Sequence, residues 1–295
     1  EAKQVAAIIL SFQTDAGGWP KNTDTISKAY EGDRSKLQPT FDNKATVDEL
    51  RFMARMVNAT QAATYRKSFD RGLTYVLSAQ YANGGWPQFF PLRKGYYDRI
   101  TFNDGAMVRI LQFVREVATE KTYAFLEPKT RAACLKAFDL GIACILKCQI
   151  VVDGQPTVWC AQHDEKTFAP AKARSYELPS FSGSESVGIV RLLIALILTL
   201  SNSNTLAMSV MERTTEIGTV MALGVKRSQV LLQFILEGAL LGVIGGLLGV
   251  ALGALLGTVI SAVGIPMPPP PGMDVGFTGE IDVSLGLSIE GFLLA

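Results

Sequence analysis

Four short clusters of polar residues carry side chains that could bind or transform a ligand. Each cluster lies in a loop or at the start of a predicted helix, where functional sites are usually built. The clusters are Asp42-Asn43-Lys44-Ala45-Thr46, Phe102-Asn103-Asp104-Gly105-Ala106-Met107, Trp159-Cys160-Ala161-Gln162-His163-Asp164 and Ala173-Arg174-Ser175-Tyr176-Glu177-Leu178. Their carboxylates, amides and cations are residue types suited to a carbohydrate site.

Asp42 and Asp104 each precede a predicted helix, and each has two interpretations. Either carboxylate could be an ordinary N-cap that accepts a backbone N–H. If both helix starts meet at one end of the fold, the two carboxylates converge, and oxygen ligands of this kind suit Ca²⁺ better than zinc or a redox metal. Arg93, Lys94 and Arg174 would then supply cations for an acidic ligand; the alternative is ordinary surface charge.

A sequence repeat predicts how these clusters are positioned. Ile9–Gln13 and Val76–Gln80 are each followed by a Gly-Gly-Trp-Pro turn, and Ile145–Gln149 is followed by a looser turn, with 67 and then 69 residues between the three glutamines. One repeat can hold two helices and two loops. The sequence therefore predicts an α/α barrel or toroid in which each helix pair packs on its neighbours.

Local patterns support the helices of this repeat. Thr46-Val47-Asp48-Glu49 is a capping-box pattern, in which the threonine hydroxyl and the glutamate carboxylate each accept a backbone N–H. Apolar stripes at helical spacing follow it and recur at 106–114 and 132–146. Trp19 and Trp86, in the two Gly-Gly-Trp-Pro turns, either plug the end of the barrel or stack on a sugar, which would require an exposed ring.

Composition excludes some classes of function and indicates that the chain joins two parts of different character. A net charge of +1 with scattered Lys and Arg gives no case for nucleic-acid binding. The chain has one histidine, so its four cysteines (Cys134, Cys144, Cys148, Cys160) favour buried thiols over a zinc site, with a disulfide left open. Residues 1–186 carry 24 basic and 20 acidic side chains, whereas residues 187–295 carry 4 and 7.

The second part of the chain has the composition of membrane helices. Leu192–Met211 is uncharged over 20 residues, and Gly238–Met267 is uncharged over 30 residues. Glycines recur at spacing four between Gly238 and Gly257, which allows close packing of membrane helices and would destabilise a soluble helix. We therefore predict transmembrane helices near 192–211 and 238–265, followed by a Pro-rich tail.

Long runs in the first part resemble the pectate lyases of polysaccharide lyase family ten. The runs are Gly17–Asn22, Asp42–Thr46, Asn83–Phe89, Pro91–Tyr97, Val158–Thr167 and Ser182–Arg191. The resemblance covers residues 1–193. It implies a mainly α fold, an incomplete α/α toroid of about three helix pairs, a secreted or periplasmic location, and Ca²⁺-dependent β-elimination of polygalacturonate (pectin).

This resemblance assigns roles to individual residues. It places Asp42 and Asp104 at the calcium and substrate site, and Arg174 among the arginines that hold acidic sugars, because the guanidinium fork matches a carboxylate. A cation on the uronate carboxylate would stabilise the enolate that forms when the C5 proton leaves. The predicted substrate-binding residues are Trp19, Asn43, Trp86, Arg93, Lys94, Asn103, Gln162, His163 and Arg174.

One departure from the family pattern bears on catalysis. The family's base is an arginine in an Arg-Asp-Gly context, and this chain contains no Arg-Asp-Gly. The resemblance therefore identifies no catalytic residue, and we expect little or no lyase activity. If the chain does turn over polygalacturonate, Arg99 and Lys94 are the first candidates for the base.

Residues 194–295 resemble an FtsX-like permease domain of ABC transporters. The runs that carry this second resemblance are Asn204–Thr219, Ala222–Gly224 and Leu236–Gly238. The resemblance implies a membrane fragment whose basic connector (Arg213, Lys226, Arg227) lies on the cytoplasmic side, where an ABC ATPase subunit would engage. The chain has no P-loop motif and hence hydrolyses no ATP by itself.

Three hypotheses follow for the chain as a whole. It is a truncated, secreted calcium pectate lyase, or a permease component with a lyase-like extracytoplasmic domain, or a chimera of two gene fragments with no function as a unit. The chain begins at Glu1 without a methionine or a leader, which is typical of a fragment or a mature form.

Overall fold

The computed structural model describes residues 1–212 and 227–263. The chain divides into two units, Glu1–Asn202 and Ser203–Ala295. The predicted Pro-rich tail and most of the predicted basic connector lie outside the described residues.

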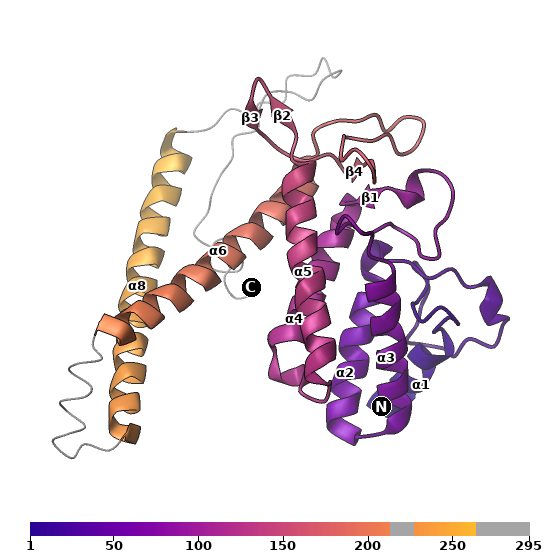
Figure 1. Ribbon diagram of the computed structural model, residues 1–295, viewed down its shortest axis with the longest axis horizontal. Coiled ribbons are helices and arrows are strands. Elements are labelled where there is room, and N and C mark those ends of the chain that lie inside the picture. Colours follow the sequence, from indigo (N-terminus) through magenta and orange to yellow (C-terminus); the bar gives the residue numbers. More distant parts are fainter. Residues whose placement is uncertain (213–226, 264–295) are drawn as a thin grey trace. The chain divides into compact units, whose positions relative to one another are not determined.

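The first unit consists of helices that are joined alternately by long and short connections (Figure 1). The helices are α1 (Ala2–Ser11), α2 (Val47–Thr60), α3 (Ala63–Ser78), α4 (Ala106–Thr119), α5 (Pro128–Cys148) and α6 (Gly183–Glu212), of which α6 belongs to the first unit as far as Asn202. α2 packs on α1, α3 and α4, and α4 packs on α5. The prediction of a mainly α, incomplete toroid of helix pairs is confirmed.

Three long loops, at 12–46, 79–105 and 149–182, follow α1, α3 and α5, which are the first helices of the pairs α1–α2, α3–α4 and α5–α6. They contain the strands β1 (Ile100–Thr101), β2 (Val151–Val152), β3 (Gln155–Pro156) and β4 (Gln162–His163), and the 3₁₀ turns η1 (Arg34–Lys36), η2 (Asp42–Lys44), η3 (Tyr96–Asp98) and η4 (Asn103–Gly105). A further 3₁₀ turn, η5 (Lys121–Tyr123), lies in the short connection between α4 and α5.

Successive long loops hydrogen-bond to one another. Thr40 of the first loop bridges to Phe89 of the second, and β1 pairs antiparallel with β4 of the third, with Ile100 opposite His163. β2 and β3 form a separate hairpin. The polar clusters predicted from the sequence are thus carried by loops that are tied together.

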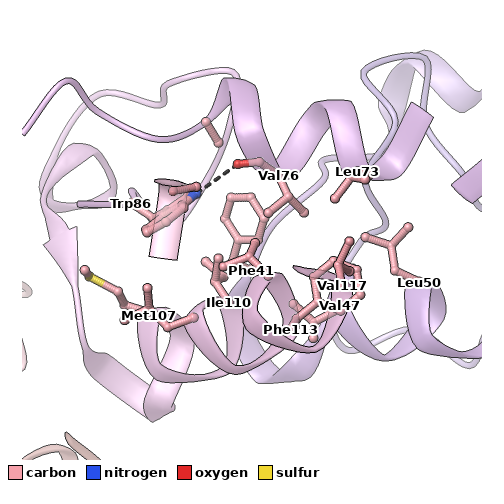
Figure 2. Packing of buried hydrophobic residues seen from close by; sticks show 14 of the residues in the cluster. Phe41, Val47, Leu50, Leu73, Val76, Trp86, Met107, Ile110, Phe113 and Val117 are labelled. Atoms are coloured by element: carbon pink, nitrogen blue, oxygen red, sulfur yellow. Dashed lines mark hydrogen bonds between the residues drawn. The ribbon is translucent and has the colours of Figure 1, made fainter. Parts of the chain in front are cut away.

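A buried tryptophan closes the end of the first helix in each pair. The indole N–H of Trp19 donates to the Ile9 carbonyl at 2.8 Å, and that of Trp86 to the Val76 carbonyl at 2.9 Å (Figure 2). Trp159 repeats the contact with Ile145 at 2.8 Å. Carbonyls in the last turn of a helix lack the usual N–H donor four residues later, so each indole supplies a donor there while its rings fill the core; the Ile9 carbonyl also accepts the Phe12 N–H at 3.1 Å.

Trp19 and Trp86 are fully buried, so their rings have no face exposed to a ligand. The structural interpretation of the Gly-Gly-Trp-Pro turns therefore holds, and the sugar-stacking interpretation is wrong for this structure. Trp159 is the third member of the set. The sequence comparison missed it because the β2–β3 hairpin lengthens the third turn.

Two glutamines of the repeat connect each turn to the next helix pair. The Gln13 amide donates to the carbonyls of Gly17 and Ser68, and the Gln80 amide donates to those of Gly84 and Ala137. Ser68 belongs to α3 and Ala137 to α5. Each turn is therefore fixed to a helix of the following repeat. Side-chain hydrogen bonds thus help to hold successive helix pairs together, in addition to hydrophobic packing.

The predicted capping box at Thr46 is only half formed. The Thr46 hydroxyl accepts the Trp19 N–H and donates to the Thr40 carbonyl, both at 2.9 Å, and makes no helix cap. Thr46 instead ties the first turn to the first loop. The Glu49 carboxylate does receive the backbone N–H of Thr46, but burial raises the pKa of Glu49 to about 7 and its Oε2 has no hydrogen-bond partner.

The beginning of α6 belongs to the helical core of the first unit. Ile189 and Leu192 are buried in that core, whereas the opposite face is exposed and apolar. The exposed residues are Val187, Val190, Ile194, Ile197 and Leu198. The candidate membrane span here is Gly183–Ser201, so it begins within the toroid and earlier than the predicted residue 192.

The described part of the second unit contains a long apolar helix, α8 (Arg227–Val263). The prediction of a helix near 238–265 is confirmed, with a start about ten residues earlier. Its segment Ser228–Leu256 has a mean hydropathy of 2.4, and this segment is long and apolar enough to cross a membrane. The glycines that the structure describes on α8 have open space around them, which leaves the predicted glycine ridge available for close helix packing.

Gly84 and Gly154 form a matched pair for testing the turn packing. Both adopt positive φ, +94° and +77°, so alanine is strained at either position. A Cβ at Gly84 would overlap the Leu140 carbonyl, whereas one at Gly154 meets nothing within 4 Å. We expect Gly84→Ala to lower the free energy of unfolding by about 3 kcal/mol and Gly154→Ala by about 1 kcal/mol.

The measurement is urea unfolding followed by tryptophan fluorescence. All three tryptophans of the chain lie in the first unit, so the signal reports on that unit alone. Equal losses in the two variants would show that backbone strain, not packing against α5, sets the requirement for glycine at Gly84.

Glu49 gives the first unit a predicted dependence of stability on pH. The native carboxyl keeps its proton up to about pH 7, whereas the unfolded chain loses it near the ordinary value of 4.5. The unfolded state therefore binds fewer protons in this window, so the free energy of unfolding falls as pH rises through it, by on the order of 2 kcal/mol. The contribution is fully present below the lower value and absent above the upper one.

Glu49→Gln removes this titration and imitates the protonated carboxyl. We expect the variant to match the wild type in acid and to be more stable above neutral pH, as measured by urea unfolding at several pH values. All other titrating groups are shared, so parallel pH curves for the two proteins would contradict the assignment.

Candidate functional site

Two equivalent turns bring the predicted metal ligands to one place. η2 and η4 each follow a buried phenylalanine, and each contains a left-handed residue, Asn43 with φ 51° and Asp104 with φ 52°. The two turns pack against each other, and Asp42 and Asp104 line the same cleft. Neither aspartate caps its helix, since the N-cap positions are Thr46 and Gly105.

We call this cavity the first cleft; its volume is about 640 Å³. Residues of all three long loops line it. They include Lys21, Asp42, Asn43, Gln88, Tyr96, Asn103, Asp104, Gln162, Arg174 and Glu177. Five predicted substrate or metal residues of the first three clusters (Asp42, Asn43, Asn103, Asp104, Gln162) and Arg174 of the fourth therefore meet there.

Asp42 is the buried carboxylate of the first cleft, with an exposed fraction of 3%. Its Oδ2 accepts an ion-pair hydrogen bond from Lys21 Nζ and a second bond from Gln88 Nε2 at 2.6 Å. Its Oδ1 is buried with no hydrogen-bond partner, and so are the side-chain oxygens of Gln88 and Gln162. Because an unpaired buried acceptor is unfavourable, these oxygens are suited to a ligand that supplies positive charge or donors.

The cleft also contains residues that the sequence reasoning missed, among them Lys21 and Gln88. Each lies two residues after the tryptophan of its turn, Trp19 or Trp86, and the repeat brings both onto the same oxygen of Asp42. The aligned turns, Trp-Pro-Lys and Trp-Pro-Gln, place Lys21 and Gln88 at equivalent positions of the repeat. The sequence alone does not show that the side chain of Asp42 lies between these two residues.

Arg174 lies at the exposed rim of the cleft. Its guanidinium pairs with Glu177 at 2.5 Å and stacks over the Tyr176 ring at 5.2 Å. The hydrogen bond to Glu177 raises the pKa of Arg174 above its ordinary value. The side chain is thus a permanent cation, held by a partner that an incoming carboxylate could replace.

Arg93 and Lys94 lie away from the first cleft. Arg93 stacks on Tyr97 at 4.5 Å, bonds to Gln38 at 3.2 Å and lines a separate groove of about 290 Å³. Lys94 is exposed and lines neither cavity. Their predicted contact with the same ligand as Asp42 has no support in this arrangement.

His163 is a structural residue of the third loop. It is fully buried, its Nε2 accepts the Cys160 N–H at 3.0 Å, and its Nδ1 lies 2.8 Å from the Phe168 carbonyl. Burial lowers the pKa of His163, so the ring is neutral and Nδ1 is the protonated nitrogen. The predicted substrate contact of His163 is wrong for this structure because the ring is enclosed.

The four cysteines are buried free thiols, as the sequence analysis predicted. The described residues contain no group of three or more acidic, histidine or cysteine side chains arranged to hold a metal ion. Any cation at Asp42 would need oxygen ligands beyond the two aspartates.

A second cleft of about 540 Å³ adjoins the first and shares Asn43 and Asp104 with it. Its other polar lining residues include Lys44, Arg109 and Glu185. Glu185 of α6 accepts the backbone N–H of Asp104 at 3.2 Å. The start of α6 thus holds the η4 turn in place.

Arg99 is engaged with acidic residues of the third loop. It pairs with Asp164 and, at 2.8 Å, with Glu165. Partial burial acts to lower its pKa, but Glu165 and Asp164 outweigh burial and raise the pKa of Arg99 above its ordinary value. A guanidinium in this position keeps its proton, which makes it a poor candidate for the base.

Two family models match the chain. Residues 13–212 match pectic acid lyase, and residues 188–295 match the FtsX-like permease C-terminal domain. The matches overlap at 188–212, within α6. The predicted join at 193 and 194 falls in this overlap.

Solved structures resemble the first unit. The family 10 polysaccharide lyase from Cellvibrio cellulosa is 36% identical with a TM-score of 0.60; it covers 65% of this chain, which spans 60% of that protein. A variant of that lyase in complex with trigalacturonic acid has the same identity and TM-score, with 61% of its length spanned. No curated protein matches the chain.

Arg99 and Arg174 allow a comparison between a structural and a rim arginine. Arg99→Gln should lower the free energy of unfolding by about 1–2 kcal/mol, because it leaves two half-buried carboxylates without their cation. Arg174→Gln should change it by less than about 0.5 kcal/mol, because the pair with Glu177 is exposed. Urea unfolding by tryptophan fluorescence measures both; equal effects would mean that Arg99 does not organise the third loop.

Proposed function

The chain belongs to the pectic acid lyase family through residues 13–212, and on that basis we propose that its first unit binds acidic galacturonan chains in the first cleft. The observation that carries the proposal is the buried, half-satisfied carboxylate of Asp42 in a cleft that also contains Arg174. Trigalacturonic acid bound to a 36% identical lyase supports the class of ligand.

Calcium fits the donor chemistry of this cleft. Asp42 and Asp104 would hold it, and the unpartnered amide oxygens of Gln88 and Gln162 are further hard ligands. Two carboxylates are fewer than Ca²⁺ usually takes, so the carboxylates of the sugar would complete the set. When bound, the cation supplies charge that neutralises the uronate and stabilises negative charge developing at its C5.

The remaining side chains of the cleft suit binding and orientation. Arg174 can exchange Glu177 for a uronate carboxylate and form two parallel N–H···O bonds. Asn43, Asn103 and Gln162 present amides that can bond sugar hydroxyls. Together they would hold an acidic sugar against Asp42 without moving the buried loop backbone.

We propose binding with little or no turnover. Lys21 and Arg174, the cations that line the first cleft in the described part of the chain, each form an ion pair with a carboxylate, so neither is free to act as a base. An eliminating base must take a proton from carbon, which requires an unprotonated group near the sugar. The absence of the family's Arg-Asp-Gly sequence agrees with this proposal.

A second function is proposed for the second unit, as a membrane anchor of permease type. The match to an FtsX-like permease and the apolar helix α8 support it. The first unit would then lie outside the cytoplasm, and an ABC ATPase subunit would be a partner at the connector. The overlap of the two families within α6 favours an origin as a chimera, which sequencing independent DNA across 185–205 would test.

Binding of trigalacturonic acid tests the main proposal. We expect calorimetry on the full chain in non-ionic detergent to show binding that weakens about tenfold or more when Ca²⁺ is removed with a chelator. Asp42→Asn and Arg174→Gln should each weaken it similarly, because each removes a charge-assisted contact. Lys94→Gln is the matched control outside the cleft and should bind as the wild type does.

Turnover is measured on the same samples as ultraviolet absorbance of unsaturated products from polygalacturonate. We expect none above the Asp42→Asn background. Ca²⁺-dependent turnover that this substitution abolishes would sink the proposal of binding without catalysis, and loss of binding in Lys94→Gln but not Arg174→Gln would move the site away from the first cleft.

A further inference from the structure

Lys21 occupies the carboxylate at which the cation is proposed to bind. Its Nζ forms an ion pair with Asp42 Oδ2, and its side chain is 31% exposed to solvent while that of Asp42 is 4% exposed. The backbone before Lys21 is held firmly, because the Trp19 indole bonds to α1 and the Trp19 N–H bonds to Thr46. Lys21 therefore extends over Asp42 from a rigid turn, with its ammonium 5.8 Å from the centre of the Phe89 ring.

A charge count shows what this contact does to the cleft. Asp42 contributes one negative charge and Lys21 one positive charge, so the partly buried pair is neutral. Gln88, the other partner of Asp42 Oδ2, adds no charge. A divalent cation at the unpartnered Oδ1 would share a single carboxylate with an ammonium, and like charges at such short range repel strongly in a partly buried site.

We propose that Lys21 is an internal competitor for the cation at Asp42, an inference that rests on the proposed calcium site. In the absence of an acidic ligand the ammonium neutralises Asp42 and keeps its affinity for Ca²⁺ low. An acidic sugar in the first cleft offers Lys21 a second carboxylate, and the ammonium can then leave Asp42 to the metal. Lys21 is thus a positioning residue that couples the binding of Ca²⁺ to that of the polyanion.

A lysine that competes with Ca²⁺ and a lysine that only supports the loop should have opposite effects on Ca²⁺ affinity when they are removed. Removing Lys21 should tighten the binding of Ca²⁺ alone by about tenfold, because a repelling charge is lost at close range. The same change should reduce the factor by which trigalacturonic acid enhances Ca²⁺ binding. A lysine that merely held the loop together would, on removal, weaken both.

The experiment is calorimetric titration of calcium chloride into the full chain in non-ionic detergent, with and without trigalacturonic acid. Lys21→Met removes the charge and keeps the length of the side chain, and Lys21→Gln is a second variant should the first fail to fold, as judged by tryptophan fluorescence. Lys21→Arg keeps the charge and should bind Ca²⁺ as weakly as the wild type. Lys44→Met is the matched control, because Lys44 belongs to the same turn as Asp42 but forms no ion pair with it within 4 Å.

The outcomes separate this inference from the proposed function. Tighter Ca²⁺ binding in Lys21→Met or Lys21→Gln, with Lys44→Met unchanged and Asp42→Asn abolished, supports the competitor role. Unchanged or weaker binding in both Lys21 variants overturns it, and so does an equal gain in Lys44→Met, which would indicate general charge. If Asp42→Asn binds Ca²⁺ as the wild type does, the calcium site itself is wrong.

Discussion

The hydrogen bond from a buried indole N–H to the last turn of the preceding helix is the contact on which the first unit depends. It occurs three times, from Trp19, Trp86 and Trp159, at nearly the same length. Each indole turns the chain back over the end of its helix and fills the core beneath the following loop. Because the loops begin from equivalent points, their side chains can meet in one cleft.

The repeat of the fold produces a site that is not itself symmetric. η2 reads Asp42-Asn43 where η4 reads Asn103-Asp104, so equivalent turns present their carboxylates at different positions. Lys21 and Gln88 are likewise equivalent, yet they share one oxygen of Asp42. A helix-pair repeat thus supplies a rigid frame, and substitutions at equivalent positions give the cleft a charged, directional interior.

α6 explains how two families can both match the same stretch of sequence. Its Ile189 and Leu192 complete the core of the first unit, and its exposed face is equally apolar. In a soluble protein such a face requires a further helix to cover it, whereas in a membrane it would contact lipid. Hydrophobic burial and membrane insertion use the same residue types, so composition alone cannot separate the two at this helix.

The sequence by itself determined the features that depend on local pattern. Helical periodicity located the helices, the recurring Gly-Gly-Trp-Pro turns indicated a toroid of helix pairs, and the change of composition located the apolar helices α6 and α8. The sequence also singled out Asp42 and Asp104 because each precedes a predicted helix, and both residues line the first cleft.

Only the tertiary structure decided which of the candidate side chains reach the cleft. His163 and the two repeat tryptophans are enclosed, Arg93 stacks elsewhere, and Lys21 lies on Asp42. Lys21 and Asp42 are separated by 21 residues, and Gln88, which bonds to the same oxygen of Asp42, belongs to the next long loop. Their meeting depends on how the helix pairs pack, because packing, not local sequence, sets the distance and direction between residues of different loops.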